Sequence, residues 1–353
     1  MRVNPMWRVL RRTHRDESGA VLMVVAVTLL VLIGMLVLTV DLGRAVAVKR
    51  EMVSGTDAAV IAAAHECALG HTYGEATAAA NAILAQNKSG AVLNGPISAP
   101  GCGNLTPTEP QLVTVQTKVQ MDYFFAGIFG FNSGEVGADA VAEWGVVKAA
   151  QGVPITVDLK QLQGCGIEPD PPSTTEIDGC QLDYPKDTLQ EPRWGVLDLS
   201  EWGDRFAAPC SVPASTSTGI INNGGTFDPM PAPAYDCMDN GLSDSVWESL
   251  EGKTLLFPVL DLDRSEGSVK PNSGPLGGSD CTGADIVSLR AQGYDCQIDT
   301  AYIVGWIQLR VNGMSKHGPD ISLDVTYLGL SSGGGIPGPG TEDWGARAVR
   351  LVT

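Results

Sequence analysis

The sequence predicts a single-pass membrane protein of the α+β class, with one transmembrane helix, an Ala-rich helical extension, an antiparallel β unit and a mostly β, loop-rich, disulfide-linked extracytoplasmic domain. Three observations lead to this prediction. Residues 19–40 are an apolar run of 22 residues without an ionisable side chain. Residues 113–120 and 136–144 alternate in the manner of strands with one buried face. All eight cysteines follow the apolar run.

The apolar run 19–40 is long enough to cross a bilayer, because a hydrocarbon layer roughly 30 Å thick needs about 20 helical residues. Residues 1–18 carry five arginines against two acidic residues, which predicts a cytoplasmic basic tail and an extracytoplasmic remainder. The alternative is a cleaved signal peptide, whose apolar region is normally about 7–15 residues. The greater length, and the charged residues that continue in helical register, favour an uncleaved signal anchor.

The chain is strongly acidic outside the basic tail. Its net charge is −17 over 353 residues, and because the tail contributes +3, the remainder carries −20. Such a charge argues against nucleic acid and against anionic lipid as partners. A hydrophobic content of 44% is sufficient for a sizeable core, and the length accommodates two ordinary domains.

Residues 41–150 are expected to form a helix plus β module. Residues 42–69 are Ala-rich and without proline, which predicts that the helix extends beyond the membrane, with a bend at Gly55 and a C-cap at Gly70. A second helix is expected at 75–87, a loop at 91–110, and then the two strands. The stripe of alanines from Ala45 to Ala68, called the alanine stripe below, suits packing either on helices of other subunits or on the protein's own β unit. The aromatic run 123–131 suits either the core or an exposed patch for a partner.

Residues 151–353 are expected to form a second, mostly β unit, because prolines interrupt any long element. Strands are predicted at 155–159, 195–199, 255–260, 303–311 and 321–328, and a helix near 243–250. Residues 331–340 have the composition of a Gly/Pro linker, after which 344–352 suits one last strand.

The cysteines indicate disulfides, since an even number lies on the predicted exported side. No C-x-x-C motif occurs and three histidines follow the apolar run, so a zinc site is not expected. No other metal and no cofactor is expected either. Pairing neighbours in sequence order is the simplest arrangement among 105. It gives Cys67–Cys102, Cys165–Cys180, Cys210–Cys237 and Cys281–Cys296.

No catalytic constellation stands out. The Gly329-x-Ser331-x-Gly333 match is followed by no histidine, which a nucleophile elbow needs. Asp261 and Asp263 resemble the start of a calcium loop, but positions six and twelve hold Glu266 and Asn272, so an acidic turn is favoured. We therefore expect no enzyme; the alternatives are an extracytoplasmic hydrolase and a ligand-binding receptor.

Three groups of motifs together resemble the TadE/TadG-like proteins of Flp (tight-adherence) pilus assembly, in the form common in actinobacteria. They are Glu17-Ser18-Gly19, Asp41-Leu42-Gly43-Arg44 and Asp57-Ala58-Ala59 around the apolar run; Phe124 to Gly130 and Val136 to Trp144; and Gly252 to Val259 with Tyr302 to Trp306.

The resemblance implies a non-catalytic single-pass membrane protein of pilus assembly or envelope anchoring, whose partners are the lipid bilayer and other pilin-like or pilus-assembly proteins. Asp41, Gly43 and Arg44 would form a membrane-exit motif. Pseudopilin members carry a Glu shortly after the cleavage-site glycine, whereas Gly19 is followed here by Ala20, Val21 and further apolar residues, so processing is not implied.

Overall fold

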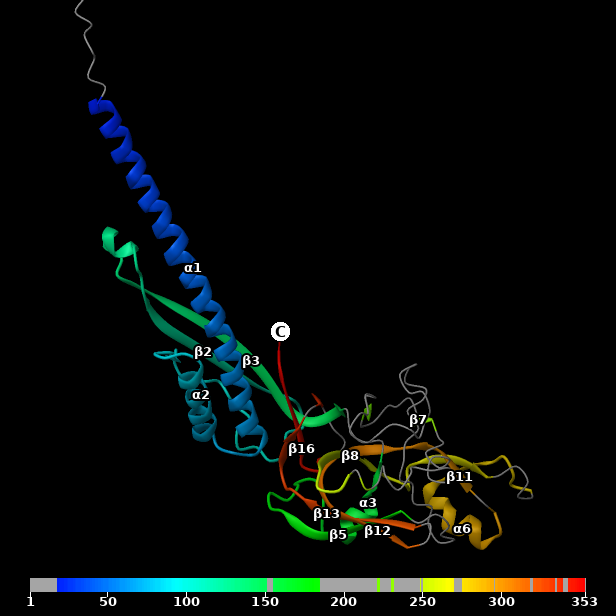
Figure 1. Ribbon diagram of the computed structural model, residues 1–353. Helices are drawn as coiled ribbons and strands as arrows, with labels where there is room; N and C mark the ends of the chain where they lie inside the picture. Colours follow the sequence, from blue (N-terminus) through cyan, green and yellow to red (C-terminus); the bar gives the residue numbers. More distant parts are fainter. Residues whose placement is uncertain are drawn as a thin grey trace, which may run out of the picture.

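The computed structural model describes residues 18–150, 155–184, 221–222, 230–231, 248, 250–269, 275–294, 296–317, 320–333, 335–338 and 342–352. In this part of the chain, one long N-terminal helix projects from a body of β-sheets (Figure 1). The predicted strand at 195–199, most of the predicted helix at 243–250, and the cysteines Cys210 and Cys237 lie outside the described residues.

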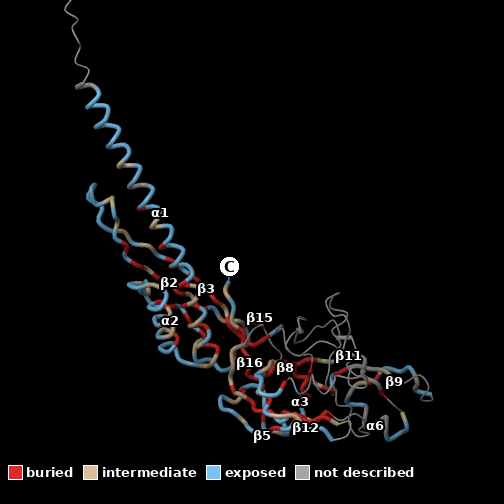
Figure 2. Tube along the Cα trace, viewed as in Figure 1, coloured by how far each residue is buried: buried red, intermediate tan, exposed pale blue. Residues whose placement is uncertain are grey.

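The projecting helix, α1, is continuous over Ser18–Ala68 and contains 51 residues. Its length and composition make Val21–Ala68 a candidate membrane span, and none of its most apolar window is buried. Figure 2 shows the change along the helix: the N-terminal half is exposed, whereas the C-terminal half has buried positions against the body. The predicted extension of the apolar helix beyond residue 40 is therefore confirmed.

A second helix, α2 (Tyr73–Asn87), packs against the last turns of α1. It begins with a capping box, in which Thr72 accepts a bond from the Glu75 backbone and Glu75 accepts one from the Thr72 backbone. Gly70 separates the two helices at φ +77°, as its predicted C-cap role requires. At Gly55 α1 continues without interruption, and a Cβ there would lie 3.3 Å from Cβ of Asn87. Close approach of α2 accounts for this glycine.

The first sheet lies along α1 and is built on a long antiparallel hairpin of β2 (Gln111–Asp122) and β3 (Ser133–Ala150). Buried and more exposed residues alternate along β2, as the sequence predicts. The strand order is β1-β2-β3-β16-β14, and β6 and β15 also pair with β3. The remaining strands are β1 (Val92–Leu93), β6 (Ile221–Asn222), β14 (Ser331–Gly333), β15 (Ile336–Pro337) and β16 (Ala346–Leu351).

The second sheet lies in the unit expected at residues 151–353 and forms its core, with the strand order β4-β8-β12-β13-β5. Phe257, Leu309 and Val325 are buried at its centre. Its strands are β4 (Val157–Asp158), β5 (Ile177–Tyr184), β8 (Thr254–Leu260), β12 (Ile303–His317) and β13 (Asp320–Tyr327). A smaller sheet has the order β10-β9-β11-β7. It contains β7 (Met230–Pro231), β9 (Glu266–Val269), β10 (Asp280–Thr282) and β11 (Cys296–Ala301), with η4 (Gly283–Asp285) and α6 (Ile286–Ala291) between β10 and β11.

Two predictions in this unit need correction. The strand expected at 155–159 is reduced to β4, because the Asp158 side chain accepts a bond from the Lys160 backbone and starts helix α3 (Leu159–Gly164). The stretch 331–340, expected to be a linker, contributes β14 and β15. Its backbone follows the edge of the first sheet, where Ser331 N donates to Gly345 O and Gly338 N to Val146 O.

The end of the chain returns to the N-terminal module. β16 pairs antiparallel with β3 from Arg347 opposite Val146 to Leu351 opposite Ala142. The expected units 41–150 and 151–353 therefore share this sheet, although the sequence placed residues 346–351 in the second unit. Arg347 is buried, ion-pairs with Asp343 and donates to the carbonyl of Leu105 at 2.8 Å.

Candidate functional site

The predicted exit motif lies where α1 meets the far end of the β2–β3 hairpin. Asp41 follows the apolar run directly and is only 5% exposed. Its carboxylate accepts backbone bonds from Phe124 at 2.8 Å, Phe125 at 3.1 Å and Ala126 at 2.7 Å. These amides lie at the start of the short 3-10 helix η1 (Ala126–Phe129). One acidic side chain of α1 therefore fixes the end of the hairpin to α1.

Asp41 remains ionised in this position. Its burial raises the pKa, but the bonds from the three backbone amides and the nearby Arg44 guanidinium together outweigh burial and hold the pKa below its ordinary value of 3.8. The carboxylate therefore keeps accepting these bonds throughout the neutral and mildly acidic range.

Two basic side chains of α1 add to the attachment. Arg44 donates from Nη1 to the carbonyl of Asp122 at 2.6 Å, and its guanidinium lies 4.4 Å from the centre of the Phe124 ring. Lys49 donates to the carbonyl of Gly137 at 2.6 Å. Gly43, the third predicted residue of the motif, has no atom within 4 Å of the position of a Cβ. Asp41 and Arg44 thus meet at the hairpin, whereas Gly43 takes no part in this contact.

Below this point, α1 packs on the inner face of the hairpin. Val48 and Met52 form a buried cluster with Val119, Met121 and Ala138. One turn further, the hydroxyls of Thr56 and Thr117 share a buried hydrogen bond of 2.6 Å.

The alanine stripe continues this contact in a second cluster. Ala59, Ala63 and Ala64 are fully buried against α2 and the hairpin. Of the two interpretations that the sequence left open, packing of the stripe on the protein's own β unit is the one observed.

Most of the aromatic run 123–131 is exposed rather than part of the core. Phe124, Ile128, Phe129 and Phe131 are 67%, 69%, 56% and 67% exposed, so they are not core residues. They belong to the turn between β2 and β3, residues 123–132, which we call the hairpin tip. The tip contains no Asp, Glu, Lys, Arg or His.

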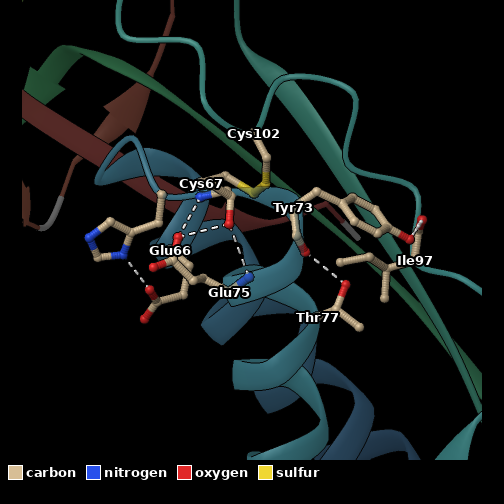
Figure 3. Close-up of a disulfide and its surroundings, with 9 residues drawn as sticks. Glu66, Cys67, Tyr73, Glu75, Thr77, Ile97 and Cys102 are labelled. Atoms are coloured by element: carbon tan, nitrogen blue, oxygen red, sulfur yellow. Dashed lines mark hydrogen bonds and ion pairs between the residues drawn. A yellow bond between two sulfur atoms is a disulfide. The ribbon is translucent and has the colours of Figure 1, made fainter.

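Three disulfides lie in the described residues, and each joins neighbours in sequence order as predicted: Cys67–Cys102, Cys165–Cys180 and Cys281–Cys296. The first connects the last turn of α1 to the loop before β2 (Figure 3). Beside it, the Tyr73 hydroxyl donates to the carbonyl of Ile97 at 3.0 Å. The end of α1 is thus covalently tied to the loop that leads into the sheet that it covers.

The proposed calcium-loop start is an ion-paired turn. The Asp261 carboxylate accepts a hydrogen bond from the backbone amide of Asp263, and it lies 3.0 Å from Nε of Arg264. Asp263 lies 2.8 Å from Nζ of Lys160. Both carboxylates therefore face basic side chains of the protein, which favours the acidic-turn interpretation over cation binding.

The fold, together with the contact of Asp41 with the β2–β3 hairpin, defines an α+β protein with a long N-terminal helix. The first half of this helix is apolar and unburied, and the second half is fixed to a β-hairpin. Residues 19–66, which include both halves, match the family model described as putative Flp pilus-assembly TadE/G-like. The resemblance expected from the motifs is confirmed for this segment, and the match supports a role in pilus assembly. Comparison with curated proteins and with solved structures gives no match.

Proposed function

We propose that this protein is a non-enzymatic, membrane-anchored component of Flp/Tad-type pilus assembly or of a related cell-envelope assembly. Residues 19–40 cross the cell membrane, the basic tail stays in the cytoplasm, and residues 41–353 are outside the cytoplasm. The protein acts by holding its body at the membrane surface, where it contacts other pilin-like or assembly proteins. No cofactor takes part.

The observation that carries this proposal is the contrast between the two halves of α1. The first half exposes a continuous apolar surface, including Val21, Leu30 and Leu36, which is unfavourable in water. At 1.5 Å per residue, the run 19–40 is roughly 33 Å long, which fits the hydrocarbon layer. The second half buries its apolar side chains in the protein.

The flanks support the proposed orientation. Five arginines precede the span, and such short basic flanks are retained in the cytoplasm. The disulfides lie after the span, which fits an oxidising compartment outside the cytoplasm.

Deletion of residues 19–40, with export through a substitute cleavable signal, tests the anchor. We expect the truncated protein in the soluble fraction, while a variant with 22 leucines in place of the run stays in the membrane, because apolar length is what is required. Retention of the deleted form in the membrane pellet contradicts the proposal.

The assembly role needs a second test in the native cell. Removal of the gene should abolish or reduce surface Flp pili, and the intact chain should restore them where the form lacking residues 19–40 does not. Normal pili in the absence of the protein contradict the assembly role and leave the anchor unaffected.

A further inference from the structure

We propose that the hairpin tip is a second membrane contact, which inserts into the lipid interface beside the point where α1 leaves the bilayer. The inference rests on the proposed function in one respect, that residues 19–40 cross the membrane. Its occupant is the lipid of the same bilayer, at the boundary between head groups and acyl chains.

The depth of the tip follows from the Asp41 contact. Asp41 is the first residue after the apolar run, and its carboxylate is bonded to the backbone of Phe124, Phe125 and Ala126. Whatever places residue 40 at the membrane surface places these three residues there too. Figure 1 shows the turn between β2 and β3 lying beside α1 and pointing toward its N-terminus, which is the direction of the proposed bilayer.

The surface of the tip is suited to that position. Phe124, Ile128, Phe129 and Phe131 expose more than half of their surface to solvent in the isolated chain, and the tip carries no charged side chain. Burial of such side chains at the acyl boundary removes apolar surface from water. Arg44 is stacked on Phe124, and arginines next to a span extend their guanidinium to the head-group level.

Backbone amides of the tip are hydrogen-bonded within the protein, which matters in lipid because an unpaired amide there is costly. The amides of Phe124, Phe125 and Ala126 donate to Asp41. Within the tip, Tyr123 donates to Asn132, and Phe131 to Ala126.

The 3-10 turn satisfies further amides. Ile128 donates to Phe125 and Gly130 to Gly127. The tip can therefore leave water without exposing these amides unpaired to lipid.

The test uses the full chain in phosphatidylcholine vesicles, with no other protein present. Single nitroxide labels are placed through Ile128→Cys and Phe129→Cys in the tip, through Asp139→Cys on the exposed face of β3, and through Leu30→Cys in the apolar run. The unsubstituted chain, treated identically, reports any labelling of native cysteines. Collisions with oxygen, which enters lipid, are compared with collisions with a polar nickel chelate, which does not.

We expect labels at 128 and 129 to favour oxygen and the label at 139 to favour the nickel chelate. Adding Phe131→Asp should shift the tip labels toward nickel, because it puts a charge in the interface. A matched exposed change on β2, Gln116→Glu, should leave them unshifted.

Two results overturn the inference. One is nickel accessibility of positions 128 and 129 in vesicles. The other is protection of these positions from the nickel chelate in native membranes but not in vesicles, which would assign the tip to a protein partner. The label at position 30 separates this outcome from failure of the proposed function. If position 30 favours oxygen while the tip favours nickel, the span stands and the tip contact fails; nickel accessibility at position 30 contradicts the span itself.

Discussion

Replacement of Arg347 by methionine should loosen the last strand from the first sheet. The guanidinium of Arg347 is fully buried, ion-pairs with Asp343 and donates to the carbonyl of Leu105. It thereby connects β16, the turn before it and the loop before β2. Methionine fills much of the space but leaves the Asp343 carboxylate buried without its cation.

The expected cost is about 3–5 kcal/mol, the range for breaking one partner of a buried ion pair. For a folded unit of this size, that cost lowers the melting temperature by about 6–20 °C. The assay is thermal unfolding of the full chain in a nonionic detergent, followed by near-ultraviolet circular dichroism of the buried Trp144 and Trp344.

Two variants sharpen the result. Arg347→Met combined with Asp343→Asn should recover much of the loss, because no uncompensated charge remains buried. Arg350→Met on the same strand removes a pair with Glu143 in which Arg350 is exposed, and should cost less than about 1 kcal/mol. If Arg347→Met is no more destabilising than Arg350→Met, the buried pair does not hold the strand.

Three further predictions concern the helices α1 and α2 and their contacts. Met52→Ala should cost about 2–5 kcal/mol in thermal unfolding, because Met52 is buried against the hairpin; the exposed neighbour change Val53→Ala should stay within about 0.5 kcal/mol, and equal effects refute the packing. Thr72→Ala should cost about 1 kcal/mol through loss of the α2 cap, and an unchanged unfolding midpoint contradicts it. Because the pKa of Asp41 is lowered, its bonds to the tip should persist as pH falls and be lost only below 3.8. A nitroxide at Ile128→Cys should then become mobile, as it should at neutral pH in Asp41→Asn, and an immobile label in either case contradicts the role of the carboxylate.

The sequence predicted the elements whose pattern is local. The apolar run, the alternation along 113–120 and the glycine at position 70 each follow from side-chain chemistry within a few residues. The pairing of neighbouring cysteines also agrees with the structure for the three described bridges, because each connects segments that fold next to one another. The capping box of Thr72 and Glu75 was not predicted, although the sequence contains its Ser/Thr-x-x-Glu pattern, which could have located the start of α2.

Long-range pairing was not predictable in the same way. Nothing near residue 346 indicates that β16 returns to β3, because the partner strand lies about 200 residues earlier and a strand's pattern does not name its neighbour. The Gly/Pro composition of 331–340 predicted a linker, yet backbone bonds to a sheet edge need no particular side chain. The Asp41 contact was missed for the same reason, since its partners are backbone amides in the hairpin tip.

The sidedness of the body can be measured most directly by fusing alkaline phosphatase to the C-terminus in one strain and a cytoplasm-dependent fluorescent protein in another. Phosphatase becomes active only where its own disulfides form, outside the cytoplasm. We predict an active phosphatase and a dark fluorescent fusion in the membrane fraction. An inactive phosphatase with a bright fluorescent fusion would place residues 41–353 in the cytoplasm and contradict both the anchor orientation and the assembly role.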